Sequence, residues 1–328
     1  MSLSNPILVT GGAGYIGSHT CKMLANQGYT PITFDNLSYG HKHTVKWGPL
    51  EVGDLADPAH INAVIKTHKP LAVIHFAAYS LVGESVREPG KYYANNVGGT
   101  LNLLNAMRAN GLDKIVFSST CATYDIPSEV PIRETTPQSP VNPYGHSKLT
   151  VEQVLKDYDA AHSLRHVALR YFNACGADRD GEIGEEHEPE THLIPRILQA
   201  MTGHGPAFSI FGEDYDTPDG TCIRDYIHVE DLAHGHLLAL RYLIDGGQSQ
   251  QLNLGTGHGY SVREIVDAVE KVTGRKVEYG IGPRRAGDPP ELTADTTKAR
   301  EVLGFKSSVS DLETIVSTAW KFHLATAR

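Results

Sequence analysis

Short apolar runs alternate with longer helical patterns along the first half of the chain. The runs at 7–10, 31–35, 71–77, 114–119 and 166–172 are typical of strands buried on both faces. Between them, side chains such as Ile16, Thr20 and Met23 fall on one face of a helix. This alternation predicts an α/β fold with a Rossmann-type, doubly wound parallel sheet, whose strands present their carboxyl ends along one ligand-binding edge.

The pattern changes after Phe172. Residues 173–192 are acidic and rich in Gly and Pro, which predicts a long loop or lid, and residues 280–291 predict a second one. Helices are expected near 192–202, 230–244, 261–272 and 309–325, and strands near 207–211 and 251–255. We expect a Rossmann domain over 1–172, with 230–257 returning to it. A smaller α/β C-terminal substrate domain is expected from 173–229 and 258–328.

A glycine-rich loop follows the first predicted strand directly. In "VTGGAGYIGSH", Gly11, Gly14 and Gly17 have the spacing that dinucleotide-binding loops use for a sharp turn, close approach of a pyrophosphate, and tight helix packing. The second strand ends in Asp35, whose carboxylate can accept both ribose hydroxyls and would repel a 2′-phosphate. These features favour NAD over NADP as cofactor.

Further cofactor contacts are expected around the same strand ends. Asp54 follows a short apolar run and is placed near the adenine, and the small residues of "HFAA" suit a cofactor that passes over a strand end. The expected cofactor-binding set is Gly11, Gly14, Tyr15, Ile16, Gly17, Asp35, Asn36, Asp54, Leu55, Phe76, Ala77, Ala78, Asn95, Lys148 and Tyr171.

A tyrosine and a lysine stand four residues apart at a predicted helix start. Asn142 suits the N-cap and Pro143 the first helical position. Tyr144 and Lys148 then continue into an apolar stripe of Val151, Leu155 and Tyr158, which turns the lysine inward. An ammonium and a cationic nicotinamide would both favour the phenolate, so the sequence predicts Tyr144 as a catalytic base with a lowered pKa.

With the glycine loop, the strand ending "FSST" and Tyr144-x-x-x-Lys148, the chain resembles the extended short-chain dehydrogenase/reductase superfamily. The resemblance implies Thr120 as the third catalytic residue, hydrogen-bonded to the reacting sugar oxygen. "HFAAYSLVGESVREPGKYYANNVGGT", "RYFNACGA", "RDYIHVEDLAHGH" and "PRRAGDPPELTAD" further resemble the UDP-galactose (UDP-glucose) 4-epimerase family.

That family resemblance implies reversible epimerisation at C4 of a UDP-hexose through a 4-keto sugar, with tightly held NAD. It implies that Arg224 and Arg285 bind the diphosphate, that Asn173 contacts it, and that the protein is a homodimer formed through two long helices, one near 90–110 and the one carrying Tyr144. The expected substrate-binding set is Thr120, Tyr144, Asn173, His192, Arg224, Arg285, Asp288 and Leu292.

Four positions depart from the family pattern. Ser80 stands where some members have a lysine against the NAD pyrophosphate, His192 replaces an asparagine, and Asp125 replaces a turn glycine. Leu292 stands where some members have a bulky tyrosine. The smaller side chain suggests that UDP-N-acetylhexosamines are also accepted.

Three other functions are alternatives to this one. Nucleotide-sugar dehydratases carry Asp-Glu after the catalytic threonine, whereas Cys121 and Ala122 follow Thr120 here and cannot act as acid and base. A catalytically inert relative would be expected to have lost part of the Thr, Tyr, Lys set, which is intact. Epimerisation of another nucleotide sugar, such as UDP-xylose to UDP-arabinose, is left open by the pocket residues.

Composition and charge limit the classes of partner that the protein is expected to bind. The 328 residues carry a formal net charge of −9, which disfavours nucleic acid as a partner. No apolar run could span a membrane and the four cysteines form no C-x-x-C pair, so a cytoplasmic location is expected. "EEHEPETH" is one residue too long for the helical zinc-protease motif and contains Pro189. We therefore expect a solvated lid there and no metal.

Overall fold

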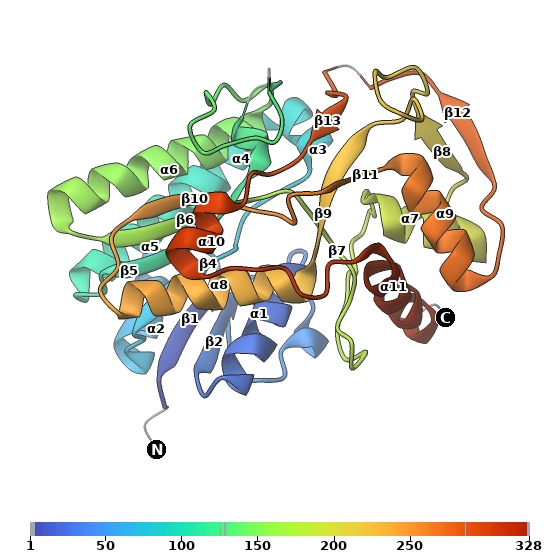
Figure 1. Cartoon of the computed structure of the whole chain (residues 1–328). Coiled ribbons are helices and arrows are strands. Elements are labelled where there is room, and N and C mark those ends of the chain that lie inside the picture. Colours follow the sequence, from blue (N-terminus) through green and yellow to red (C-terminus); the bar gives the residue numbers. More distant parts are fainter. Residues whose placement is uncertain (1–3, 125, 128, 286, 327–328) are drawn as a thin grey trace.

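A seven-stranded, fully parallel sheet forms the centre of the computed structural model, which describes residues 4–124, 126–127, 129–285 and 287–326 (Figure 1). Its strand order is β10-β6-β5-β4-β1-β2-β3. The strands are β1 (Pro6–Thr10), β2 (Thr30–Asp35), β3 (Leu50–Val52), β4 (Ala72–His75), β5 (Lys114–Thr120), β6 (Arg165–Tyr171) and β10 (Gln250–Leu254). The predicted doubly wound sheet is confirmed, and Asp125 lies outside the described residues.

Successive residues of each strand serve two separate cores. In β1, Ile7 and Val9 pack toward α1 (Tyr15–Asn26), α8 (Val229–Ile244) and α10 (Thr297–Leu303). Leu8 faces the opposite side, which α2 (Pro58–His68), α5 (Thr100–Ala109) and α6 (Pro143–His162) cover. Helices on both faces explain why the central strands, such as β1 and β4, are mainly apolar rather than alternating.

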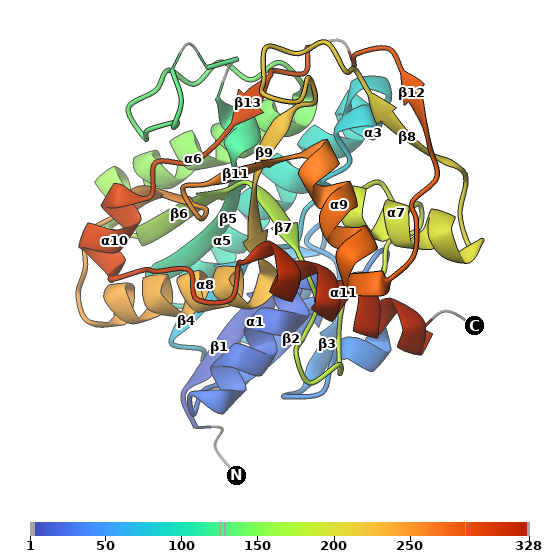
Figure 2. The ribbon, with the colours of Figure 1, turned by 45° about the vertical axis from the view of Figure 1, so that its right-hand side comes forward.

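The smaller C-terminal part gathers to one side of the large sheet (Figures 1 and 2). A four-stranded sheet holds β11 (Gly259–Ser261), β9 (Ile223–His228), β13 (Glu291–Leu292) and β7 (Asn173–Cys175), and β12 (Tyr279–Gly282) pairs with β8 (Phe208–Phe211). The helices are α7 (Leu193–Thr202), α9 (Val262–Thr273) and α11 (Leu312–Thr326).

The observed elements correct both predicted long loops. The loop predicted for 173–192 begins with β7, and the one predicted for 280–291 contains most of β12 and the first residue of β13. The assignment of 230–257 to the first domain stays a prediction, although α8 packs against the large sheet and β10 is its edge strand beside β6.

Helix α6 begins as the sequence predicts. The Asn142 side chain accepts a hydrogen bond from the Gly145 amide at 2.9 Å, and Pro143 is the first helical residue. Tyr144, Lys148, Val151 and Leu155 are buried along one face, and Tyr158 is half-buried. The predicted stripe is confirmed, and it turns Lys148 toward the sheet.

A buried ion pair joins α6 to the sheet. Arg170 of β6 contacts Glu152 of α6, with Nη2 2.6 Å from Oε2 and side chains that are 3% and 0% exposed. Glu152 also accepts from the Ser119 hydroxyl at 2.6 Å, and Arg170 donates to the Tyr124 hydroxyl at 2.8 Å. Because each charge has several partners, this network fixes α6 against β5 and β6.

Candidate active site

A cleft of about 430 Å³ runs along the carboxyl ends of the large sheet. It is lined by the glycine loop, the ends of β2, β4, β5 and β6, and the first turns of α6. Of the predicted site residues, those that line it are Gly11, Gly14, Tyr15, Ile16, Gly17, Asp35, Asn36, Leu55, Phe76, Ala77, Ala78, Asn95, Thr120, Tyr144, Lys148, Tyr171, Asn173, His192, Arg224 and Leu292.

Glycine is required at the three loop positions for two different physical reasons. A Cβ on Gly11 would lie 2.6 Å from the Ala77 amide nitrogen, and one on Gly17 would lie 2.1 Å from the Gly11 oxygen, so packing excludes side chains at both. A Cβ on Gly14 would meet only the Gly11 oxygen, at 3.4 Å, and Gly14 lines the cleft. The free space above Gly14, beside the start of α1, fits a pyrophosphate.

Asp35 is held rigidly at the end of β2. Its Oδ2 accepts from the Ala13 amide at 3.0 Å and its Oδ1 from the Leu37 amide at 2.8 Å, which leaves lone pairs for two ribose hydroxyls. Burial raises the pKa of this carboxyl, against the two amide bonds that lower it. The glycine loop and Asp35 together fit NAD. Asp54 does not line the cleft; its Oδ2 accepts from Asn36 at 2.8 Å.

The Lys148 ammonium lies at the floor of the cleft and has few polar neighbours. Its ammonium donates to the Ser118 carbonyl at 2.8 Å and lies 4.9 Å from the centre of the Phe117 ring. Burial lowers the pKa of Lys148 to about 7. The ammonium is therefore easily neutralised and can pass a proton on near neutral pH.

The protein groups around Tyr144 do not favour its phenolate. Burial raises the pKa of Tyr144 and Tyr171 raises it further, while a hydrogen bond with Thr120 lowers it only in part. The expected lowering of the Tyr144 pKa by an ammonium together with a cationic nicotinamide is not reached by the protein groups alone, because burial of the phenol outweighs the hydrogen bond with Thr120.

Thr120 ends β5 next to this pair. Its Oγ1 accepts from the Ala122 amide at 3.1 Å, so the hydroxyl is oriented by the turn that follows the strand. The side chain is almost fully buried, and it lines the cleft with Tyr144 and Lys148. The structure thus brings the three predicted catalytic residues together, at the end of one strand and the start of one helix.

Sequence reasoning missed Asn96, which orders this corner of the cleft. It lies in a π-helical turn, η2 (Tyr93–Gly99), between α4 (Pro89–Tyr92) and α5. Its amide donates to the Ser147 hydroxyl at 3.0 Å, and Ser147 donates to the Tyr144 carbonyl at 2.7 Å. Asn95, the predicted contact, donates to the Asn96 side chain at 2.9 Å. Two adjacent asparagines were the only sequence signal.

A second pocket of about 180 Å³ adjoins the cleft toward the C-terminal part. Arg224, Asn173 and His192 line both, whereas Arg285 and Asp288 line only the second. The Arg224 guanidinium donates to Asp288 and to the Pro289 carbonyl, and Arg285 lies over the Phe211 ring at 4.6 Å. Two guanidinium groups beside one pocket suit a diphosphate.

The segment between β7 and α7 is not the solvated lid that the sequence predicted. The side chains of Glu185 and Glu190 are only 5% and 3% exposed. His41 bonds to the Glu186 carbonyl at 3.0 Å and Lys46 donates to the Glu182 carbonyl at 2.8 Å, so the segment is tied to the Rossmann part. The polar residues of this segment suggested solvent exposure, because the residues that bind the segment lie elsewhere in the chain and leave no sign in its own sequence.

Membrane insertion through helices finds no support. Within the described ranges, no helix combines the length and apolar character that crossing a bilayer would require.

Comparison with known proteins gives consistent matches. Residues 7–255 match the model of the NAD dependent epimerase/dehydratase family. The chain is 55% identical to a protein of Rhizobium meliloti (strain 1021) named UDP-glucose 4-epimerase, over 98% of this chain and 97% of that protein.

Solved structures agree with the sequence matches. A UDP-glucose 4-epimerase from Brucella ovis, in complex with NAD, is 55% identical with a TM-score of 0.95, over 97% of this chain and 98% of that one. A UDP-glucose-4-epimerase from Stenotrophomonas maltophila, with bound NAD and formylated UDP-arabinopyranose, is 40% identical with a TM-score of 0.95, over 98% and 99%.

Proposed function

The chain belongs to the NAD dependent epimerase/dehydratase family, and from this premise we propose that it interconverts UDP-galactose and UDP-glucose by epimerisation at C4. The observation that carries this proposal is the burial of Tyr144, Lys148 and Thr120 in the same cleft as a glycine loop with open space above Gly14. The cofactor is NAD, which when bound supplies a hydride acceptor and donor at C4.

The protein residues divide the remaining tasks. Tyr144 takes the proton of the sugar 4-hydroxyl and returns it to the 4-keto sugar after the ring has turned over. Lys148, whose pKa burial brings to about 7, supplies charge and a proton path beneath the phenol. Thr120 hydrogen-bonds the reacting oxygen and steers it toward Tyr144.

The nucleotide is held from the other side. Arg224 and Arg285 flank the second pocket, and we assign the diphosphate to them, with Asn173 and His192 where the two pockets meet. A firm hold on the diphosphate leaves the hexose free to rotate above Tyr144. In this scheme Asp288 positions Arg224, with which it is paired.

The cofactor requirement tests this function. We expect purified protein, given UDP-galactose without added NAD, to form UDP-glucose, because each catalytic cycle returns the hydride it removes. Product identity is measured by chromatography of the nucleotide sugars. Turnover that needs added NAD and accumulates NADH would mean a dehydrogenase instead, and a dehydrated 4-keto-6-deoxy product would mean a dehydratase.

Substrate range depends on Leu292. It lies in β13 opposite Arg224 of β9, packs in a small cluster with Cys121 and Phe172, and lines the cleft. Its modest volume leaves space for a 2-acetamido group, so UDP-N-acetylhexosamines are accepted as well. UDP-xylose and UDP-arabinose remain a second candidate pair, since the Stenotrophomonas relative was crystallised with a modified UDP-arabinopyranose.

We expect Leu292→Tyr to lower turnover of UDP-N-acetylgalactosamine at least tenfold more than turnover of UDP-galactose, because the phenol fills that space. Kinetics with both substrates measure the ratio, and Leu292→Met, which conserves volume, is the control. If the unmodified chain turns over the N-acetyl substrate at less than roughly a thousandth of the UDP-galactose rate, a gap of about 4 kcal/mol, Leu292 does not open the site.

Assembly and location complete the proposal. We propose a homodimer formed through α6 and the helices from α4 to α5, as in the family resemblance, with Tyr93 of η2 exposed on that part of the chain. Light scattering would give twice the 35.7 kDa of one chain. The four free cysteines suit the reducing cytoplasm, where we place the protein.

A further inference from the structure

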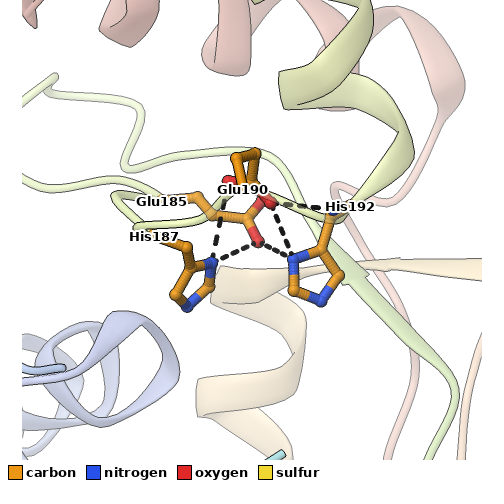
Figure 3. Close-up of side chains that lie close together, drawn as sticks. All are labelled: Glu185, His187, Glu190 and His192. Carbon is orange, nitrogen blue, oxygen red and sulfur yellow. Dashed lines mark hydrogen bonds and ion pairs between the residues drawn. The ribbon is translucent and has the colours of Figure 1, made fainter. Parts of the chain in front are cut away.

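Two carboxylates and two imidazoles converge at the wall of the active-site cleft. Glu185, His187, Glu190 and His192 all come from the segment between β7 and α7 (Figure 3). Figure 3 shows the Nδ1 atoms of both imidazoles turned toward the two carboxylates. Each residue offers one ligand atom, and these four atoms lie within 4.8 Å of one another.

Four contacts between the carboxylate oxygens and the ring nitrogens have separations close to those between ligands of a tetrahedral zinc ion. Glu185 Oε1 lies 3.2 Å from His187 Nδ1 and 2.8 Å from His192 Nδ1. Glu190 lies 3.1 Å from His192 Nδ1 through Oε1 and 3.7 Å from His187 Nδ1 through Oε2. Ligands bound tetrahedrally at zinc distances are separated by about 3.3 Å, in the middle of this range.

The hydrogen bonds within the group are incomplete. Glu185 Oε1 and His187 Nδ1 are both buried and have no hydrogen-bond partner. Glu185 is 5% exposed, and its Oε1 faces both imidazole nitrogens at ion-pair distance, without the angles of a hydrogen bond. A buried carboxylate oxygen and a buried ring nitrogen that lie close together without forming a hydrogen bond suit a cation that both could bind.

Charge gives the same indication. Two buried carboxylates beside a cleft that must accept two pyrophosphates need two positive charges, which either one divalent cation or two protonated imidazoles can supply. One divalent cation would neutralise both carboxylates while the imidazoles stay neutral and act as ligands. Two imidazole nitrogens argue against Mg²⁺ and Ca²⁺, which prefer oxygen, and favour zinc among the first-row ions.

We propose that Glu185, His187, Glu190 and His192 form a structural Zn²⁺ site. Four protein ligands close the coordination shell, so the ion has no open position for catalysis. Its role is to fix the segment that forms the cleft wall, because Glu185, His187 and His192 line the cleft. Coordination through Nδ1 leaves the Nε2 of His192 available to the nucleotide sugar.

This proposal revises the expectation of no metal at this segment. That expectation rested only on the mismatch between "EEHEPETH" and a helical zinc motif. The segment around Pro189 is indeed not helical. A loop can reach the same coordination geometry without helical spacing. The ring of His187 also packs edge-on against Tyr15 of the glycine loop, at 6.1 Å between centroids, so the site borders the cofactor side of the cleft.

A second acidic group differs in one decisive respect. Asp178, Asp180 and Glu182 also lie close together, but the Lys22 ammonium contacts all three at 2.7–2.9 Å. The cation that this group requires is therefore already part of the chain. It serves as a matched control for metal binding by clustered acidic side chains.

Metal content tests the proposal independently of any enzymatic activity. Untagged protein is incubated with ZnCl₂, passed through a desalting column into metal-free buffer, and assayed by plasma mass spectrometry. We expect about one zinc per chain, and loss of at least 90% of it in His187→Ala and in the isosteric Glu190→Gln. Asp180→Asn, in the control group, should retain the metal.

Two results would overturn the proposal. One is the absence of zinc from the folded parent protein, in which case protons neutralise the group: without a metal, burial lowers the pKa of His187 but the two carboxylates raise it to about 9. The other is equal zinc content in parent and both variants. Thermal unfolding with and without zinc adds a second measurement, since zinc should raise the Tm of the parent and not of Glu190→Gln.

Discussion

Replacement of Tyr144 by phenylalanine is expected to lower kcat for UDP-galactose by about 10²–10⁴-fold, with KM changed far less. In the proposed scheme the Tyr144 phenol is the proton acceptor. It lines the cleft together with Thr120 and Lys148, and the substitution removes only its oxygen. Steady-state kinetics with UDP-galactose measure the change.

Tyr158→Phe is the matched control. It removes the same oxygen from the same helix, and the Tyr158 hydroxyl donates to Asn105 at 2.9 Å at an exposed site. Retention of NAD by both variants, together with unchanged circular dichroism, would show that the fold and cofactor site survive. If Tyr144→Phe then epimerises near the parental rate, the base must be another group.

Replacement of Arg170 by leucine is expected to lower the free energy of unfolding by about 3–5 kcal/mol. The substitution leaves Glu152 charged and fully buried in α6, with the Ser119 hydroxyl as its closest remaining partner. Urea unfolding followed by circular dichroism measures the difference. Activity should fall at temperatures where the parent is still fully active, because α6 carries Tyr144.

Two variants distinguish the stability cost of leaving a charge buried from the cost of losing an ion pair. Arg165 lies on the same strand and pairs with Asp159 at 3.0 Å, but its side chain is 38% exposed, so Arg165→Leu should cost at most about 1 kcal/mol. Replacing both Arg170 and Glu152 by leucine should recover much of the stability. Similar losses in Arg165→Leu and Arg170→Leu would contradict the expected dependence on burial.

Local sequence signals were sufficient for the parallel sheet and for α6. The central strands of the large sheet, such as β1 and β4, are mainly apolar on both faces, and Asn142 with Pro143 marks a helix start that depends only on adjacent residues. Tyr144 and Lys148 could be oriented from this start because helical periodicity extends the buried stripe to Leu155. Most cleft residues follow the strand ends, so they could also be placed in advance.

Strand β9 could not be predicted in this way. It contains Arg224, Asp225 and His228, all buried, and such residues suggest an exposed loop. Asp225 is tolerated in the interior because it accepts from the amides of Thr256 and Gly257 and from that of Ala294, which are distant in sequence. When backbone amides distant in sequence satisfy a buried polar group, the sequence around that group shows no pattern that would predict its burial.

The same limitation hid the group around Glu185. The sequence shows four glutamates and two histidines within eight residues, but burial of Glu185 and Glu190 depends on how the segment folds back against the cleft. Ring nitrogens and carboxylate oxygens converge only after that folding. Composition alone therefore suggests that the segment is exposed to solvent, whereas the folded structure buries Glu185 and Glu190.

The late return of the chain to the large sheet has a consequence for protein synthesis. Helix α8 provides much of the core on one sheet face, and β10 covers the edge of β6. Until residue 254 has left the ribosome, Ile7, Val9 and their neighbours have no complete cover and β6 is an unpaired edge. The glycine loop is made first but becomes rigid late, so nascent chains should depend on chaperones and acquire the cofactor only after most of the polypeptide is complete.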